Sequence, residues 1–459
     1  MNTQPANLLL AATALGLYAV MCLVILRGTI AKRRALAHLA HTPAGTIAQV
    51  LVVHASQTGT AEGLAVHTAD SLQAAGLVVT LHSLKDVDRD TLLATPEVLF
   101  LVSTYGEGDP PDAAAAFVAT LMRDETLDLS SLKFGLLALG DKTYQNFCGF
   151  GRQLEAWLKQ RGASPLFDTI ELDGMDAHAL RTWRHELSHL AATSDLPEWQ
   201  DLPYETWKLQ KRVHLNPGSQ GAPAFHLELS RENLTADAWE AGDLLQLQIP
   251  SEPDRPRDYS IASIPADGAV HLLVRQQRRE DGSFGLGSGF LTSTLGEGST
   301  LQARLRRHSQ FRIGGNTDRD LILIGNGTGL AGLRAHLKQR ELASSTGAPS
   351  HRHWLLFGER QSAYDALHGA ELQTWHASGL LTRLDLVYSR DDATHRYVQD
   401  KLREEGSRLR EWIDAGAALC VCGSLEGMAE GVAEVLREQL GDEGVEKLQI
   451  EGRYLRDVY

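Results

Sequence analysis

The sequence is short of cysteine and of positive charge, and each shortage excludes a class of protein. Its 459 residues include four cysteines, too few for a disulfide framework and typical of a reducing compartment. Lys and Arg number 44 against 58 Asp and Glu, a net charge of −14, so no nucleic-acid partner is expected. There is no paired CxxC set, and no metal site is predicted.

The composition is that of an ordinary globular protein, with 43% hydrophobic and 22% charged residues. This excludes a mostly disordered chain, a collagen and a polytopic transporter. A chain of 459 residues is too long for one hydrophobic core and predicts two or three domains.

A long apolar run lies near the amino terminus. Leu8–Leu26 is uncharged, and as a helix it would span ~28 Å, close to the ~30 Å hydrocarbon core of a bilayer. The alternative is a cleaved signal peptide, but no Lys or Arg precedes the run, whereas four cations follow it between residues 27 and 34. We therefore expect a transmembrane anchor over 7–27, in a bacterial inner membrane, with the rest of the chain in the cytoplasm.

Beyond residue 45, short apolar runs alternate with helical patterns. The pattern predicts an α/β multidomain chain: a doubly wound domain over 46–195, an antiparallel β-barrel over 203–315 and a second α/β domain over 316–459. In doubly wound domains the ligand binds at the carboxyl ends of the strands. The clearest predicted strands are Gln49–His54, Val98–Ser103, Phe134–Leu139, Phe225–Leu229, Leu244–Gln248, Leu321–Ile324, Trp354–Phe357, Leu384–Tyr388 and Ala418–Val421.

Three loops at strand ends suggest a ligand site in the first domain. Residues 56–62 combine hydroxyl side chains with one Gly at a helix start, where backbone amides and the helix dipole favour an anion. The loop has no Lys of a nucleoside-triphosphate site, so a monophosphate fits better. Residues 103–111 and 139–147 each carry one aromatic, Tyr105 and Tyr144, which could sandwich a planar ring. Taken singly, each loop could be an ordinary helix start or surface turn.

These loops, SQTGTAE, STYGEGDPP and LGDKTYQNF, resemble the three FMN-binding loops of the flavodoxin-like domain of diflavin reductases. That family includes the flavoprotein subunit of sulfite reductase and the microsomal NADPH–cytochrome reductases. The resemblance implies that residues 56–60 hold the FMN phosphate and that Tyr105 and Tyr144 flank the isoalloxazine. The implied FMN residues are Ser56, Gln57, Thr58, Gly59, Thr60, Ser103, Thr104, Tyr105, Gly106, Gly108, Leu139, Gly140, Asp141, Tyr144 and Phe147.

The barrel region carries two segments similar to those that hold FAD in ferredoxin-reductase barrels. In the RxYS-like segment, the resemblance places Arg257 on the pyrophosphate and Tyr259 and Ser260 at the flavin ring. A later Gly/Ser turn, residues 285–291, would contact the same pyrophosphate through Gly285, Gly287 and Ser288.

The last domain resembles the ferredoxin-reductase-like domain that binds NADPH. The loop at 325–332 follows a predicted strand, as a dinucleotide loop should, and differs from the family in Asn326 and Gly332, where Pro is usual. His395 likewise replaces the usual Lys, and Ser424 the usual Asp. The implied NADPH residues are Gly327, Thr328, Gly329, Ser389, Arg390, Arg396, Tyr397 and Gln399, the last five reading the 2′-phosphate.

The catalytic residues are also implied by the resemblance. Ser260, Cys422 and Asp457 would lie near the nicotinamide C4 and the flavin N5, and Tyr459 would cover the FAD ring. The family's helical connecting insertion has no room here, so the orientation of the FMN domain is expected to depend on the linker alone.

The resemblance thus implies a membrane-anchored NADPH-dependent diflavin oxidoreductase with FMN, FAD and NADPH as cofactors. Hydride would pass to FAD, then to FMN, and single electrons would pass to a haem or iron acceptor at the membrane, either a protein or an iron chelate. Residues 46–195 have 10 Lys and Arg against 20 Asp and Glu, which would attract a basic acceptor. The alternatives are a tethered sulfite-reductase-type subunit with a soluble acceptor and a non-catalytic flavin-binding redox sensor.

Overall fold

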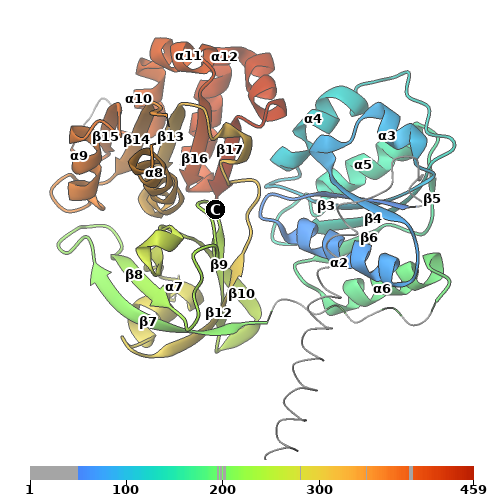
Figure 1. Ribbon diagram of the computed structural model, residues 1–459, viewed down its shortest axis with the longest axis horizontal. Coiled ribbons are helices and arrows are strands. Elements are labelled where there is room, and N and C mark those ends of the chain that lie inside the picture. The colour runs from blue at the N-terminus through green and yellow to red at the C-terminus, as the bar shows by residue number, and fades with distance from the viewer. Residues whose placement is uncertain are drawn as a thin grey trace, which may run out of the picture. The chain divides into compact units, whose positions relative to one another are not determined.

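The computed structural model describes residues 50–459 apart from a few short gaps. The residues left out of this range are 194, 195, 197, 198, 200–202, 280, 348 and 392–395. The predicted anchor over 7–27 lies outside the described residues. Among the residues that are described, no helix is both long enough and apolar enough to cross a bilayer. Gln49–Tyr459 form one compact unit that contains three sheets (Figure 1).

The first sheet is parallel, and its strand order is β2-β1-β3-β4-β5, with β6 paired to β4. Its strands are short apolar runs because helices cover both faces: α2 and α6 on one, and α3, α4 and α5 on the other (Figure 1). The elements are β1 (Val50–Ala55), α2 (Thr60–Ala74), β2 (Val79–Ser83), α3 (Arg89–Ala94), β3 (Glu97–Ser103), α4 (Ala115–Phe117), β4 (Lys133–Gly140), α5 (Gly149–Gln160), β5 (Ser164–Pro165), β6 (Ile170–Asp173) and α6 (Ala177–Leu190).

The second sheet is antiparallel, with the strand order β10-β9-β12-β7-β8-β11. Its outer strands approach each other, since Ile261, next to β10, bridges to Leu272 in β11. Alternate residues of these strands enclose a core that includes Trp207 and Trp239. The elements are β7 (Glu205–His214), β8 (Ala224–Ser230), β9 (Leu244–Ile249), β10 (Glu252–Ser260), β11 (Val270–Arg275), α7 (Leu286–Gly289) and β12 (Thr300–Arg306).

The third sheet is again parallel, with the order β15-β14-β13-β16-β17. Helices α8 and α9 cover one face, and α10, α11 and α12 cover the other (Figure 1). The elements are β13 (Leu321–Asn326), α8 (Leu330–Ser345), β14 (His353–Glu359), α9 (Gly369–Ala377), β15 (Arg383–Tyr388), α10 (Val398–Glu404), α11 (Gly406–Asp414), β16 (Ala418–Gly423), α12 (Glu430–Ile450) and β17 (Tyr454–Val458).

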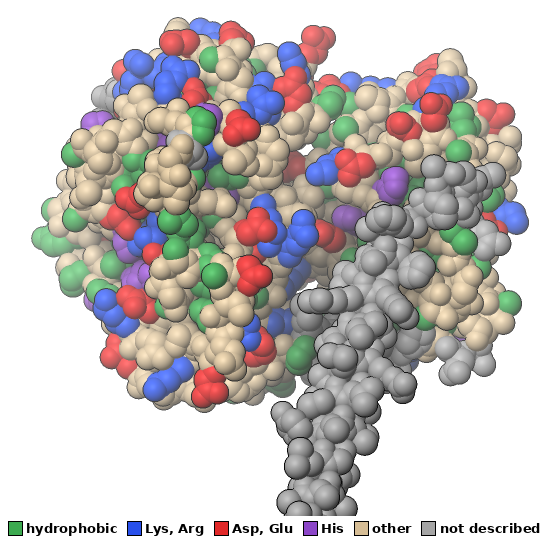
Figure 2. Space-filling view, viewed as in Figure 1, with side chains coloured by type: hydrophobic (Ala, Val, Ile, Leu, Met, Phe, Trp, Pro, Cys, Tyr) green, Lys and Arg blue, Asp and Glu red, His purple; other side chains and the backbone are tan. Residues whose placement is uncertain are grey.

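We call residues 50–193 the flavodoxin half and residues 203–459 the reductase half. Acidic and basic side chains are scattered over the visible face of both halves rather than gathered by sign (Figure 2). Many of them form exposed ion pairs, such as Arg403 with Glu438 and Arg152 with Glu171. Exposed pairs of this kind contribute little to stability, so the buried charges described below carry more information.

Candidate functional site

The residues implied to perform hydride transfer meet at the carboxyl edge of the third sheet. Ser260 ends β10, Cys422 lies in β16, and Asp457 lies in β17 beside it as its register partner. The Ser260 hydroxyl donates to Asp457 Oδ2 at 2.6 Å, and the Cys422 thiol donates to the same oxygen at 3.6 Å. Three strands from two sheets therefore assemble one buried polar cluster.

Burial determines the protonation of the Cys422 thiol. Ser260 is 9% exposed and Asp457 6%, while Cys422 is fully buried. Burial, together with the negative charge of Asp457, raises the pKa of the Cys422 thiol well above its ordinary value. The thiol therefore stays protonated and serves as a hydrogen-bond donor.

Tyr459 lies against the loop that follows β13. Its hydroxyl donates to Thr328 Oγ1 at 3.1 Å, and its main chain pairs with Gly423 and Leu425 at 3.0 Å. The residue as a whole is 58% exposed, but burial of its hydroxyl raises the pKa of Tyr459 well above its ordinary value. Its coverage of FAD stays a prediction, but the ring is held beside the implied NADPH loop.

The loop after β13 has the shape of a dinucleotide site. A Cβ on Gly329 would lie 2.0 Å from the carbonyl oxygen of Cys422, so no larger residue fits. Asn326, which stands where the family usually has Pro, accepts a hydrogen bond from the Ser424 amide at 3.0 Å. This bond links the loop after β13 to the loop after β16, and both approach the hydride cluster.

The residues implied to read the 2′-phosphate lie at the end of β15 and the start of α10. The main chain of Ser389 and Arg390 is fixed by hydrogen bonds to Glu359 and Arg360 at 2.9 and 2.8 Å. Gln399 donates to Gly427 O at 3.2 Å, and Tyr397 is exposed. His395 lies outside the described residues.

Two exposed cations lie in this region. Arg390 and Arg396 are both exposed, and neither forms an ion pair with any other described residue. Two guanidinium groups of this kind suit a phosphate, which they can bind in bidentate fashion.

The two segments implied to hold the FAD pyrophosphate are in contact. A Cβ on Gly287 would lie 2.5 Å from the Tyr259 hydroxyl and 3.1 Å from Cγ of Arg257. Ser288 Oγ accepts a hydrogen bond from the main-chain N–H of Gln277 at 3.0 Å, which fixes the turn beginning at Gly285. An Arg beside a small-residue turn fits a diphosphate.

The first implied FMN loop begins helix α2. Gly59, the N-cap, has φ +80°, a left-handed conformation that favours glycine. Ser56 and Gln57 are buried, whereas Thr58 is exposed and Thr60 starts the helix. A helix start with a left-handed Gly and a hydroxyl fits a phosphate monoester.

The second and third implied FMN loops pack on each other. Gly108 (φ +117°) leaves room for Asn146, which donates to Glu107 O at 2.7 Å. Thr104 Oγ1 accepts from Phe150 N, Thr104 N donates to Leu139 O, and Asp141 Oδ1 accepts from Thr143 N. The remaining implied residues of these two loops are Ser103, Gly106, Gly140 and Phe147.

The two implied flavin-flanking aromatics differ in burial. The Tyr105 hydroxyl is buried and has no hydrogen-bond partner among the described residues. Tyr144 is 38% exposed. A flat ligand with polar edges placed between them could supply the missing partner, and this fits FMN.

Reductase-half side chains contact the first FMN loop, and the sequence does not reveal this contact. Arg306, in β12, donates to Thr58 O at 2.8 Å and to Thr60 Oγ1 at 3.2 Å. His308 Nε2 lies 2.8 Å from Gln57 O. The expectation that the linker alone orients the FMN domain is therefore wrong.

An ion pair that the sequence does not reveal lies beside the dinucleotide loop. Arg275, at the end of β11, pairs with Glu359, at the end of β14, and the Glu359 side chain is 3% exposed. Burial raises the pKa of Glu359, and the guanidinium of Arg275 opposes this change. The signal in the sequence is weak, since a single charge at the end of an apolar run is common.

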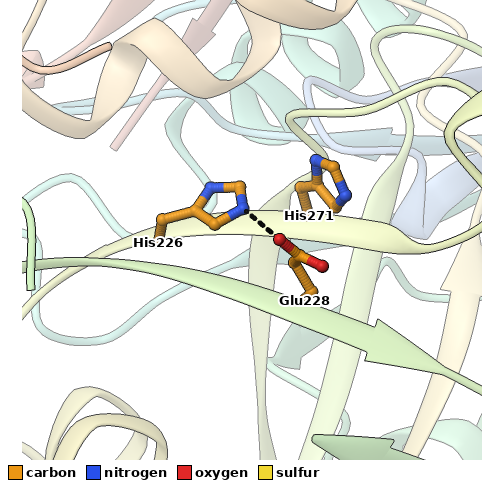
Figure 3. Close-up of side chains that lie close together, drawn as sticks. All are labelled: His226, Glu228 and His271. Atoms are coloured by element: carbon orange, nitrogen blue, oxygen red, sulfur yellow. Dashed lines mark ion pairs between the residues drawn. The ribbon is translucent and has the colours of Figure 1, made fainter. Parts of the chain in front are cut away.

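His226, Glu228 and His271 form another cluster in the antiparallel sheet (Figure 3). Their potential metal-binding atoms lie within 4.8 Å of one another, and His226 Nε2 is 3.4 Å from Glu228. However, Lys211 Nζ lies 3.1 Å from Glu228, and Arg334 Nη1 lies 3.4 Å from His271 Nδ1. Because these cations already neutralise the cluster, a further positive ion is disfavoured there.

Comparison with known proteins assigns the two parallel sheets. A flavodoxin family model matches residues 52–185, and an oxidoreductase NAD-binding domain matches residues 323–434. The chain is 28% identical to the sulfite reductase [NADPH] flavoprotein alpha-component of Sodalis glossinidius, over 91% of this chain and 90% of that protein. The proteins of the same name from Klebsiella pneumoniae and Neisseria meningitidis serogroup C are 27% and 28% identical, covering 94% and 89% of this chain and 93% and 89% of their own.

The alignment with the Sodalis protein spans 550 positions, more than the 459 residues of this chain. The relative therefore contains segments without a counterpart here, which agrees with the lack of room for a connecting insertion.

The expected inner-membrane location is wrong. The relatives that match about nine-tenths of the chain are sulfite reductase flavoprotein components, and the described residues include no helix that could span a bilayer. The anchor was predicted from the apolar run and the four cations that follow it, and the acceptor at the membrane rested on that anchor.

The flavodoxin and NAD-binding domains, together with the relatives, place the chain among known flavoproteins. These findings support the diflavin reductase family for this chain, which is an NADPH-dependent flavin oxidoreductase with FMN, FAD and NADPH as its cofactors.

Proposed function

We propose that this oxidoreductase is the flavoprotein component of a sulfite-reductase-type enzyme and delivers single electrons to a separate acceptor protein. The relatives bear the name of such a component, and their alignments with this chain cover 90% and 93% of their own length. A nicotinamide releases two electrons as hydride, and two flavins in series can release them one at a time. The acidic flavodoxin region favours an acceptor with a basic surface.

The cluster of Ser260, Cys422 and Asp457 is the observation that carries the catalytic part of the proposal. In it, Asp457 orients the Ser260 hydroxyl through the 2.6 Å hydrogen bond and holds the Cys422 thiol as a donor. We assign these groups to the nicotinamide and the flavin ring that receives the hydride.

Other side chains of the proposed site bind rather than react. Arg390 and Arg396 would hold the 2′-phosphate, and residues 327–329 would hold the dinucleotide backbone. Arg257, with the turn at 285–288, would hold FAD, and Tyr459 would limit access to the flavin ring. Residues 56–60, with Tyr105 and Tyr144, would hold FMN.

The catalytic part is tested with the purified chain, NADPH and a one-electron dye. We expect NADPH-dependent dye reduction, which Ser260→Ala should lower by about 10²-fold or more without loss of bound flavin. A chain that binds both flavins but does not oxidise NADPH would instead be a redox sensor, which is the second candidate function.

The acceptor part needs a separate measurement. The chain is mixed with the remaining sulfite-reducing component of a relative, such as that of Klebsiella pneumoniae, and sulfite-dependent NADPH oxidation is followed. Salt-sensitive turnover would support the proposal. Dye reduction without any sulfite-dependent oxidation would contradict the assignment of the acceptor but not that of the hydride site.

A further inference from the structure

Arg456 lies one residue before Asp457 of the hydride cluster, and its side chain points to the opposite face of β17. Successive side chains of a strand alternate between faces, so strand β17 presents Asp457 to Ser260 and Cys422 and presents Arg456 to the flavodoxin half. One short strand therefore contacts both the hydride cluster and the implied FMN loops.

The Arg456 guanidinium forms a bidentate ion pair with Asp112. Nε donates to Asp112 Oδ2 at 2.8 Å, and Nη2 donates to Oδ1. The two side chains are only 15% and 10% exposed. A paired, largely buried guanidinium of this kind fixes geometry more strongly than a surface pair.

The same guanidinium stacks on an implied FMN residue. Its Cζ lies 5.0 Å from the ring centroid of Tyr105, within the range of a cation–π contact. One face of Tyr105 is thus occupied by Arg456, so a flavin that stacks on this ring would use the other face.

Gln57 connects this contact to the first FMN loop. Its amide Nε2 donates to Asp112 Oδ2 at 2.9 Å and to Arg456 O at 3.3 Å, and its Oε1 accepts from Asp112 N at 3.1 Å. The group formed by Gln57, Tyr105, Asp112 and Arg456, here named the clamp, therefore ties two FMN loops to the reductase half.

We propose that Arg456 is a positioning residue for electron transfer between the two flavins. It holds the Tyr105 loop against β17 and places a positive charge next to the ring on which FMN would stack. In the step it serves, one electron leaves the FAD site and enters the FMN site. The inference rests on the proposed function, since it requires both flavins to occupy their implied sites.

Because the clamp contains charged residues, its disruption should shift the FMN midpoint potential in a way that loss of an uncharged contact would not. An electron that reaches the FMN site adds negative charge, which Arg456 favours and Asp112 disfavours. Removing Arg456 leaves a buried carboxylate, and removing the charge of Asp112 leaves a buried guanidinium. Both changes break the same ion pair, but they should shift the FMN midpoint potential in opposite directions.

The experiment uses the full-length flavoprotein and the variants Arg456→Gln, Asp112→Asn and their combination. Arg123→Gln is the matched control, because Arg123 also pairs across the two halves, with Glu446 at 3.0 Å, but is 67% exposed and does not form part of the clamp. Midpoint potentials are measured by spectroelectrochemical titration, which needs no NADPH. Electron transfer from the FAD site to the FMN site is followed separately by stopped-flow absorbance.

We expect the FMN potential to fall in Arg456→Gln, rise in Asp112→Asn and return close to that of the unsubstituted protein in the combination. A shift of 59 mV would correspond to a tenfold change in the one-electron equilibrium. Transfer between the flavins should slow by about tenfold or more in both single variants and change by less than about twofold in Arg123→Gln.

Shifts of the same sign in both single variants, or shifts no larger than in Arg123→Gln, would overturn the inference. Arg456→Lys keeps the positive charge but not the bidentate guanidinium contact. Its FMN midpoint potential should therefore stay unchanged, whereas its electron transfer between the flavins should slow. A lowered FMN midpoint potential in Arg456→Lys would also count against the inference. Absence of NADPH oxidation by the unsubstituted protein would contradict the proposed function instead and would leave the titration result intact.

Discussion

The two parallel sheets share a strand arrangement but carry different chemistry at their carboxyl edges. At the first sheet the implied phosphate site, residues 56–60, offers chiefly hydroxyl groups, one glycine and main-chain amides, and the nearby acids Asp88 and Asp176 cap helices at the surface. At the third sheet the edge carries buried ionisable groups, chiefly Asp457 and Glu359. The comparison indicates that the flavodoxin half binds through backbone shape and the reductase half through individual side chains.

The largest effect should come from the reductase edge. Asp457→Ala leaves Ser260 and Cys422 without their shared acceptor, and hydride transfer should fall by about 10²–10⁴-fold. Thr58→Ala at the flavodoxin edge keeps the backbone amides and should weaken FMN binding by less than about tenfold. Single-turnover NADPH oxidation and flavin titration measure the two effects, and similar losses would contradict the comparison.

A second test removes a phosphate contact from the reductase half. Arg390→Gln should raise the KM for NADPH by about 10–100-fold, the value of one charge-assisted contact, and leave the KM for NADH unchanged. Arg403→Gln, which breaks an exposed pair with Glu438 in the same half, is the control. Equal increases in the KM for NADPH and for NADH would show that Arg390 does not bind the 2′-phosphate.

Acid should weaken the reductase half more than the flavodoxin half, because burial lowers the pKa of five histidines in the reductase half and of one, His54, in the flavodoxin half; the five are His226, His271, His336, His353 and His368. Burial and the nearby Arg334 lower the pKa of His271 to about 4 and that of His368 to about 3, from 6.5 in the unfolded chain. The unfolded chain therefore binds more protons below pH 6.5, so this stability is complete above pH 6.5 and decreases as the pH falls toward 4.

The helix-capping acids of the flavodoxin half titrate lower. Hydrogen bonds from the side chain and main chain of Thr91 lower the pKa of Asp88 below 3.8, and main-chain hydrogen bonds do the same for Asp176, so their stabilisation persists until the pH falls below about 4. Thermal unfolding monitored in each half between pH 7 and 4 checks the order. His271→Gln should flatten the pH dependence of the reductase half, whereas the exposed control His376→Gln should not.

The smallest effects concern two helical glycines. Gly63 in α2 has nothing within 4 Å of its would-be Cβ, so Gly63→Ala should stabilise the protein by about 1 kcal/mol. In α8 a Cβ on Gly332 would lie 2.7 Å from the buried Phe311 ring, so Gly332→Ala should destabilise by about 1–3 kcal/mol. Denaturant unfolding distinguishes the two signs, and stabilisation by both would show that α8 has room to move.

Much of the fold follows from local pattern. The predicted strands Val98–Ser103 and Leu321–Ile324 became β3 (Glu97–Ser103) and β13 (Leu321–Asn326), because buried parallel strands are apolar along their whole length. The strand β17 was not predicted, since it is short and contains Arg456 and Asp457, and only its pairing with β16 makes it a strand.

Of the candidate site, only the residues that lie in recognisable motifs were predicted. Ser260, Cys422 and Asp457 were chosen by resemblance, and the structure brings their side chains together. The pair of Arg456 and Asp112 was missed, because 344 residues separate them and nothing local to either one indicates a partner. Contacts of this type arise from tertiary packing.

The position of β17 at the border of its sheet has a consequence for the handling of fragments. Its outer main chain is covered by Gln57, which donates to Arg456 O, whereas the opposite border strand β15 carries the ion pair of Arg383 and Asp385. Charged border strands resist self-association, and an uncovered one is a template for a second copy. A reductase fragment separated from the flavodoxin half would therefore expose unpaired main-chain groups on β17 and should aggregate at concentrations at which the full chain stays dispersed.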